Sequence, residues 1–139
     1  MHAKTLIVAT ILLISIPLLI GCGGGKTNNA NPNPNPNPTK SDAINTTTLQ
    51  AVNDVQDQGL VVTCGPGTFE PDATVHIIDP NGTVATGTAL SNGQFNLGNW
   101  QFPQNFITAI GTTITITQVA PGKTESDPLT MVVQDITQI

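Results

Sequence analysis

The chain has 139 residues, and 4 lysines face 9 acidic side chains, which gives a formal net charge of −5. This balance argues against binding to nucleic acid, because that function needs clustered basic side chains to neutralise phosphates. Charged residues make up only 9% of the sequence, against roughly 25% in an ordinary soluble domain. The composition therefore fits an extracellular β-domain better than a cytosolic enzyme.

Residues 1–21 have the composition of a secretory signal peptide. Lys4 supplies a short positive start, and an apolar stretch runs from Thr5 to Ile20. A membrane-spanning helix usually needs about 20 apolar residues, whereas this shorter stretch is interrupted by Pro17 and is followed by glycines. We therefore expect the segment to be cleaved, and an uncleaved membrane anchor is the alternative.

The end of this segment reads Leu19-Ile20-Gly21-Cys22 and resembles the lipobox of bacterial lipoproteins. The resemblance implies that diacylglycerol is joined to the Cys22 sulfur, that the leader is cleaved before Cys22, and that the new amino terminus is acylated, for example with palmitate. Two or three acyl chains, at roughly 0.8 kcal/mol per buried methylene, hold a small domain durably on a membrane. The expected location is the extracytoplasmic side of a bacterial cell membrane or outer membrane. A plain secreted protein with an incidental cysteine is the alternative.

Residues 22–44 are predicted to be the lipidated cysteine followed by a linker. The segment contains GGGKTNN and then the dipeptide Asn-Pro repeated through residues 31–38. Proline fixes φ and favours extended geometry in the residue before it, so the repeat is expected to form a semi-rigid stalk of about 3 Å per residue. A low-complexity tract without a selected length is the other interpretation.

Residues 45–139 are predicted to form one folded domain. Alternation with period two is clearest in Thr112–Val119, where Ile114 and Ile116 share one face. Turn residues rich in Asn, Pro and Gly occur at 80–82, 91–93 and 121–123. We expect an all-β sandwich of about seven strands. The expected strands lie near residues 48–54, 59–64, 73–79, 83–90, 93–98, 111–119 and 129–135.

Alternate apolar positions on these strands define the expected core. Its members are Val61, Val75, Ile77, Phe95, Leu97, Trp100, Ile114, Ile116, Met131 and Val133. Trp100 is interpreted as core rather than as a ligand platform, because large rings dominate small cores. Trp100, Phe102 and Phe106 nevertheless form the only aromatic concentration in the chain. They are candidate ligand-binding residues for a sugar or a peptide if two of the rings are exposed side by side.

The order of short motifs between residues 59 and 135 resembles a bacterial immunoglobulin-like (Ig-like) domain. The motifs are Pro-x-Ala-x-Val at 71–75, Asp-x-x-Gly at 79–82, Gly-x-Phe at 93–95 and Ser-x-Pro at 126–128. The resemblance implies an Ig-like β-sandwich. Fibronectin-like and transthyretin-like sandwiches stay as alternatives, because the segment 100–110 is long for this pattern.

Residue patterns for catalysis are scarce. The sequence has no HExxH, CxxC, P-loop or GxSxG pattern. Cys64 and His76 would form a nucleophile and its base only on neighbouring strands, and we expect a buried Cys64 and an outward-facing His76. Because Cys22 is expected to carry lipid, Cys64 has no partner for a disulfide within the domain. We therefore expect no catalytic residues.

Metal binding depends on where three aspartates lie. Asp72, Asp79 and Asp127 fall in predicted turns, and they would bind Ca²⁺ only if they met at one end of the sandwich. Turn aspartates usually cap their own backbone instead. We expect no metal and no cofactor.

The sequence favours a lipid-anchored, non-catalytic module that binds an envelope protein or polysaccharide, or supports envelope structure. An accessory subunit of a larger envelope assembly is the first alternative, and a small envelope enzyme is the least favoured. Residues 45–139 carry one lysine against eight acidic side chains, hence a net charge of −7. Binding to teichoic acids or lipopolysaccharide phosphates would therefore need bridging cations.

Overall fold

The computed structural model describes residues 37–54 and 59–138. The predicted signal peptide, the lipidation site Cys22 and the linker up to residue 36 lie outside the described residues. Within the described ranges, no helix has the length and apolar character needed to span a bilayer.

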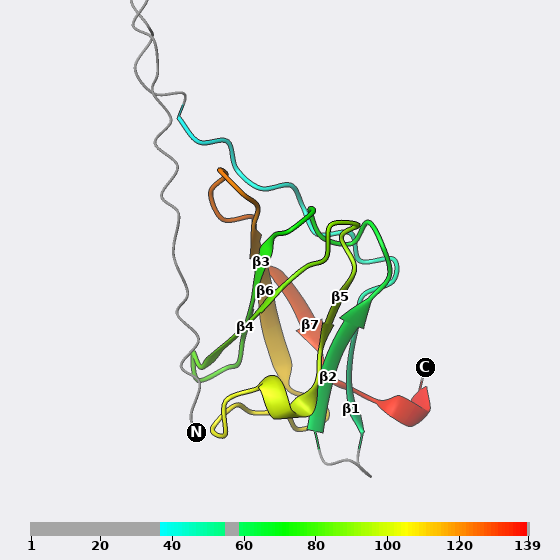
Figure 1. Ribbon diagram of the computed structural model, residues 1–139. Coiled ribbons are helices and arrows are strands. Elements are labelled where there is room, and N and C mark those ends of the chain that lie inside the picture. Colours follow the sequence, from blue (N-terminus) through cyan, green and yellow to red (C-terminus); the bar gives the residue numbers. More distant parts are fainter. Residues whose placement is uncertain (1–36, 55–58, 139) are drawn as a thin grey trace, which may run out of the picture. The chain divides into compact units, whose positions relative to one another are not determined.

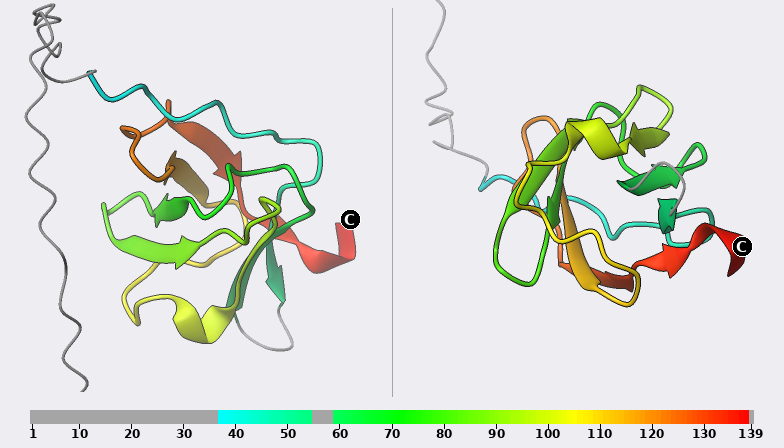
Figure 2. Two further views of the ribbon diagram at one scale, coloured as in Figure 1. Left: turned by 45° about the horizontal axis from the view of Figure 1, so that its top comes forward. Right: turned by 90° about the horizontal axis from the view of Figure 1, so that it is seen from below.

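Two four-stranded sheets make up the fold. The elements are β1 (Gln50–Asp54), β2 (Gly59–Cys64), β3 (Thr74–Ile78), β4 (Val84–Thr88), β5 (Phe95–Leu97), the 3-10 helix η1 (Asn99–Gln101), β6 (Thr113–Val119), β7 (Leu129–Val132), β8 (Gln134–Asp135) and the 3-10 helix η2 (Ile136–Gln138). The strand orders are β5-β2-β1-β8 and β4-β3-β6-β7. The sheets face each other, as Figures 1 and 2 show, and this confirms the predicted β-sandwich.

Glycine at positive φ closes the three predicted turns. The φ angles are 82° at Gly82, 77° at Gly93 and 74° at Gly122, a region that costs glycine little because it has no Cβ. Space is tightest at Gly93, where an added Cβ would lie 2.2 Å from the carbonyl oxygen of Phe69. The turns therefore set where the strands on either side of them end.

The core lies between the sheets. Seven of the ten predicted core residues are buried, namely Val75, Ile77, Phe95, Leu97, Ile114, Ile116 and Val133. The Phe95 ring packs edge-on against Phe69 with a centroid separation of 5.4 Å. Full burial of one such side chain contributes about 1.5–3 kcal/mol, so this layer is the main source of the domain's stability.

Of the other three core predictions, Val61 and Trp100 are wrong and Met131 is confirmed in part. Val61 is half-exposed because Leu60 and Val62 take the inward positions of β2. All three residues are apolar, so the sequence does not show which of them face the core. Met131 packs against the core but is only partly buried, since β7 is an edge strand. Trp100 lies on η1 beyond the sheets, and its exposed fraction is 87%.

The expected strand at 129–135 is in fact two strands in different sheets, which makes eight strands rather than seven. β7 pairs with β6, and β8 pairs in parallel with β1 at Val52 and Asn53. The crossing point is the buried Val133, whose N–H donates to the Thr112 carbonyl over 2.8 Å. This residue links the two sheets covalently.

The hydrogen-bonded body begins at Thr39, before the predicted domain boundary at residue 45. The Thr39 carbonyl accepts a hydrogen bond from Thr124 N–H, and Ser41 N–H donates to the Thr124 carbonyl, each over 2.9 Å. Ser41 is buried, and its Oγ accepts a hydrogen bond from Ala120 N–H over 2.9 Å. Residues 39–42, called the tether below, therefore run beside the loop that joins β6 to β7 (Figure 1).

Candidate functional site

The sandwich has two ends that carry different side chains. β3 runs from Thr74, which pairs with Val119, to Ile78, which pairs with Thr115. The tether lies at the Val119 end, which we call the tether end. η1 lies at the opposite end, the η1 end, where the Asn99 side chain occupies the space that a Cβ on Gly59 would fill. Figure 1 shows both ends.

An ion-pair cluster attaches the tether to the domain. Lys123 Nζ lies 2.8 Å from Glu70 Oε2 and 3.8 Å from Asp42 Oδ2. The Asp42 N–H also donates a hydrogen bond to Glu70. The hydrogen bond from Lys123 holds the pKa of the Glu70 carboxyl below its ordinary value, and Glu70 raises the pKa of Lys123 in return. These charged side chains therefore hold the tether against the domain.

Gln118 is the buried centre of this attachment, and the sequence analysis missed it. Its exposed fraction is 1%. Its Nε2 donates to the Asp42 carbonyl over 2.9 Å, and its Oε1 accepts from Glu70 N–H over 2.8 Å. A signal for it was present, because residue 118 continues the inward face of Ile114 and Ile116. A buried amide at such a position needs hydrogen-bond partners.

Asp79 organises the η1 end. Its exposed fraction is 4%, and its Oδ1 accepts hydrogen bonds from Asn81 N–H over 2.9 Å and from Thr83 N–H over 2.8 Å. Its Oδ2 accepts one from Ile107 N–H over 3.0 Å. Burial raises the pKa of the Asp79 carboxyl, but the three N–H donors outweigh burial, so the pKa lies below its ordinary value. The prediction that this aspartate caps its own turn is confirmed.

The three turn aspartates do not meet, so the Ca²⁺ interpretation is wrong. Asp72 precedes β3 and Asp79 follows it, and a strand of this length spans about 17 Å. Asp127 is exposed and pairs with Lys40 of the tether. Within residues 37–54 and 59–138, no group of three or more His, Cys, Asp or Glu side chains is placed to hold a metal ion.

Cys64 and His76 lie in different sheets, so the nucleophile-and-base interpretation is also wrong. Cys64 on β2 is a free thiol buried in the core. His76 on β3 alternates with the buried Val75 and Ile77 and faces outward, with Nδ1 3.4 Å from Glu125 Oε1. The predicted burial of Cys64 and outward position of His76 are both confirmed.

The aromatic segment 99–106 places its rings in two environments. Phe102 and Phe106 are buried, and their rings pack with centroids 4.9 Å apart and planes inclined by 54°. Trp100 faces solvent. The condition for a multi-ring platform, two exposed rings side by side, is not met. Phe102 and Phe106 therefore support the segment from within, and only Trp100 presents its ring to solvent.

A groove of about 390 Å³ lies beside Trp100, and we call it the η1 groove. Its lining residues are Asn99, Trp100, Phe102, Pro103, Gln104, Phe106 and Thr108. None of these side chains is charged. The lining therefore combines aromatic surface with amide and hydroxyl groups, a composition that suits an uncharged polar ligand.

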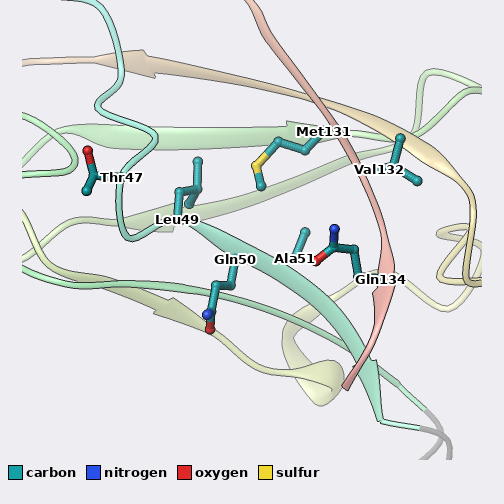
Figure 3. Close-up of a pocket in the computed structure, with 7 residues that line it drawn as sticks. All are labelled: Thr47, Leu49, Gln50, Ala51, Met131, Val132 and Gln134. Atoms are coloured by element: carbon teal, nitrogen blue, oxygen red, sulfur yellow. The ribbon is translucent and has the colours of Figure 1, made fainter. Parts of the chain in front are cut away.

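A second groove, of about 460 Å³, lies where β1 of one sheet faces β7 of the other. Figure 3 shows all seven lining residues, with Leu49, Ala51 and Met131 gathered between the two strands. β8 pairs with β1 only at Val52 and Asn53, so among the described strands the start of β1 has no neighbour on this side. The groove is the open edge of the sandwich.

A family model described as Bacterial Ig domain matches residues 47–135. The match covers more than half of the chain, and the chain belongs to this family. The matched range contains all eight strands, which confirms the resemblance found in the sequence. Neither the curated proteins nor the solved structures gave a match. Membership indicates a non-catalytic binding or structural module.

Proposed function

We propose that the protein is a lipid-anchored module of the bacterial envelope, whose Ig-like domain is a non-catalytic binding or structural element for an envelope protein or polysaccharide. The proposal of a lipid anchor rests on the sequence Leu19-Ile20-Gly21-Cys22 at the end of an apolar leader. The match to the Bacterial Ig domain family, which begins at residue 47, supports a binding or structural role for the domain.

The chemistry of the two grooves supports binding over catalysis. General acid–base catalysis needs a titratable side chain within hydrogen-bond reach of the substrate. Neither the η1 groove nor the groove between β1 and β7 is lined by such a side chain. A third groove, of about 440 Å³, is lined by Asp135, whose Oδ1 accepts a hydrogen bond from Thr137 N–H. Asp79, Glu70 and Glu125 accept hydrogen bonds from neighbouring groups of the domain instead.

The anchor is tested by comparing the wild type with Cys22→Ala in detergent phase partition and intact-mass measurement. We expect the wild type in the detergent phase, with a mass that fits loss of residues 1–21 and addition of acyl chains. Cys22→Ala is expected to lack the mass of the acyl chains. Cys64→Ala, which changes the only other cysteine, is the control and should behave like the wild type. Aqueous partition and unacylated masses for both the wild type and Cys22→Ala would refute the anchor.

One observation favours a second candidate, an accessory subunit of a larger envelope assembly. The open edge between β1 and β7 leaves backbone groups that suit strand addition by a partner chain. Purification from solubilised membranes tests this role. Stoichiometric recovery of one defined complex would support the subunit, and recovery of the isolated chain would support the independent module.

A further inference from the structure

We propose that Trp100 and the η1 groove bind a neutral carbohydrate chain. This inference rests on the proposed function, because it names the class of ligand that the domain would engage. The inferred site combines one exposed indole ring, a hydrogen-bonded segment around it and an uncharged polar lining.

The exposure of Trp100 contrasts with that of every other aromatic side chain in the protein. All four phenylalanines are at most 9% exposed, whereas the single tryptophan is 87% exposed. Tryptophan is highly buried on average in folded proteins. Leaving this ring in solvent forgoes the stabilisation that burial of a large aromatic side chain contributes.

The indole is held over a small residue. A Cβ added to Gly98 would lie 3.5 Å from Trp100 Nε1 and 3.9 Å from Cδ1. One edge of the ring therefore rests near the Gly98 backbone while the rest of the side chain faces solvent. This arrangement leaves the ring open to a flat ligand.

The segment around Trp100 is held by hydrogen bonds and by packing of its neighbours. Gly98 N–H donates to Gln101 Oε1 over 2.8 Å, and Gln101 N–H donates to the Gly98 carbonyl over 3.0 Å. The buried rings of Phe102 and Phe106, which line the same groove, pack on each other, and Asp79 accepts a hydrogen bond from Ile107 N–H. A preformed site loses little conformational entropy when it binds, which favours affinity.

The lining matches the two surfaces of a sugar. A pyranose ring has an apolar face of C–H bonds that stacks on an aromatic ring, and a rim of hydroxyl groups that donate and accept hydrogen bonds. The Gln104 amide and the Thr108 hydroxyl line the same groove as Trp100. Amide groups both donate and accept, as hydroxyl groups require.

Charge selects among carbohydrates. The groove has no charged lining residue, and residues 45–139 carry one lysine against eight acidic side chains, hence −7. An anionic polymer would meet repulsion without a compensating cation, and a basic peptide would find no carboxylate in the groove. A neutral glycan has no such requirement. The groove also lies at the end of the domain opposite the tether, so attachment through the tether leaves it open.

The single tryptophan makes the test direct. The full chain, purified from membranes in detergent, is titrated with cellohexaose, chitohexaose and soluble mannan while tryptophan emission is recorded. We expect a saturable change in emission with at least one of these neutral glycans. Polygalacturonate, an anionic polysaccharide, should give none.

Variants assign the binding to the site, with affinity electrophoresis as a second readout. Trp100→Ala should weaken binding about tenfold or more, and Gln104→Ala about threefold. Leu90→Ala removes another exposed large side chain, 59% exposed in a turn at the tether end, and should leave binding unchanged. Circular dichroism confirms that each variant is folded.

Three results would overturn the inference. The first is no change in tryptophan emission with any of the three neutral glycans, and the second is unchanged glycan binding by folded Trp100→Ala. The third is a change in emission with lipid only. The last is measured as quenching of Trp100 by brominated phosphatidylcholine in reconstituted vesicles. Detergent partition of the same preparation reports on the Cys22 anchor separately, so failure of the glycan site and failure of the anchor are distinguishable.

Discussion

The tether end and the η1 end use their polar side chains differently. Among the described residues, each of the four ion pairs includes a residue between Lys123 and Asp127, in the loop at the tether end. The η1 end has the carboxylate of Asp79, turned inward to backbone N–H groups, and an uncharged groove beside an exposed ring. The comparison teaches that charged side chains at the tether end attach one segment of the chain to another, whereas the η1 end leaves its tryptophan ring exposed.

The largest expected effect separates the aromatic residues of the η1 end. Phe106→Ala should lower the free energy of unfolding by about 3 kcal/mol, because it removes a buried ring that packs on Phe102. Trp100→Ala should change it by no more than about 0.5 kcal/mol, because the ring is exposed. Urea unfolding followed by circular dichroism measures both. Equal losses in the two variants would show that Trp100 is part of the core.

Asp79→Asn should come next, with a loss of about 2 kcal/mol. The amide retains one acceptor oxygen but places an NH₂ group against backbone N–H donors that the second carboxylate oxygen now satisfies. The control is Asp127→Asn at the tether end, whose exposed ion pair should contribute at most about 0.5 kcal/mol. A similar small loss in both variants would contradict the structural role of Asp79.

Acid should weaken the domain through the same carboxylate. The folded-state pKa of Asp79 lies below its ordinary value because its N–H donors outweigh the effect of burial. Its contribution is therefore fully present above the unfolded-state pKa, near 4, and is lost as pH falls through the folded-state pKa. The free energy of unfolding, measured from about pH 6 to about pH 3, should decline as the pH falls. Asp79→Asn should decline less steeply, and an unchanged slope would assign the effect to other carboxyls such as Glu70.

The smallest effect concerns the tether. Glu70→Gln removes the charge that pairs with Lys123 and weakens the acceptor of Asp42 N–H. Global stability should fall by no more than about 1 kcal/mol, while amide hydrogen exchange at residues 40–42 should become faster. Exchange at Gln101 and Phe106 should stay as in the wild type. Faster exchange at both ends would show that the two ends are not independent.

The sequence predicted the strands well because two local signals agreed. Alternation along Thr113–Val119 and glycine turns at residues 82, 93 and 122 are properties of short segments, and they fix strand positions to within a few residues. The phase of β2 was misjudged where Leu60, Val61 and Val62 are all apolar. The break at Val133 was missed because alternation continues while the pairing partner changes from β6 to β1.

The candidate site was located by the sequence but not resolved. The concentration of Trp100, Phe102 and Phe106 marked the segment that lines the η1 groove, yet residue type alone did not show which ring faces solvent. That choice depends on tertiary packing, in which the Phe102 and Phe106 rings are buried against each other and Trp100 is left exposed. The attachment of the tether depends on contacts between residues far apart in the chain, such as Asp42 with Gln118, and no local pattern reports them.

The parallel pairing of β1 with β8 has a consequence for biogenesis. It joins Val52 to Gln134 and Asn53 to Asp135, so one sheet is complete only when strands from opposite ends of the domain are both present. Contacts of such sequence separation form slowly, because a long loop must close first. A nascent chain ending before Gln134 lacks this pairing, so the sheet that contains β1 gains its fourth strand only after residues 134 and 135 have been made.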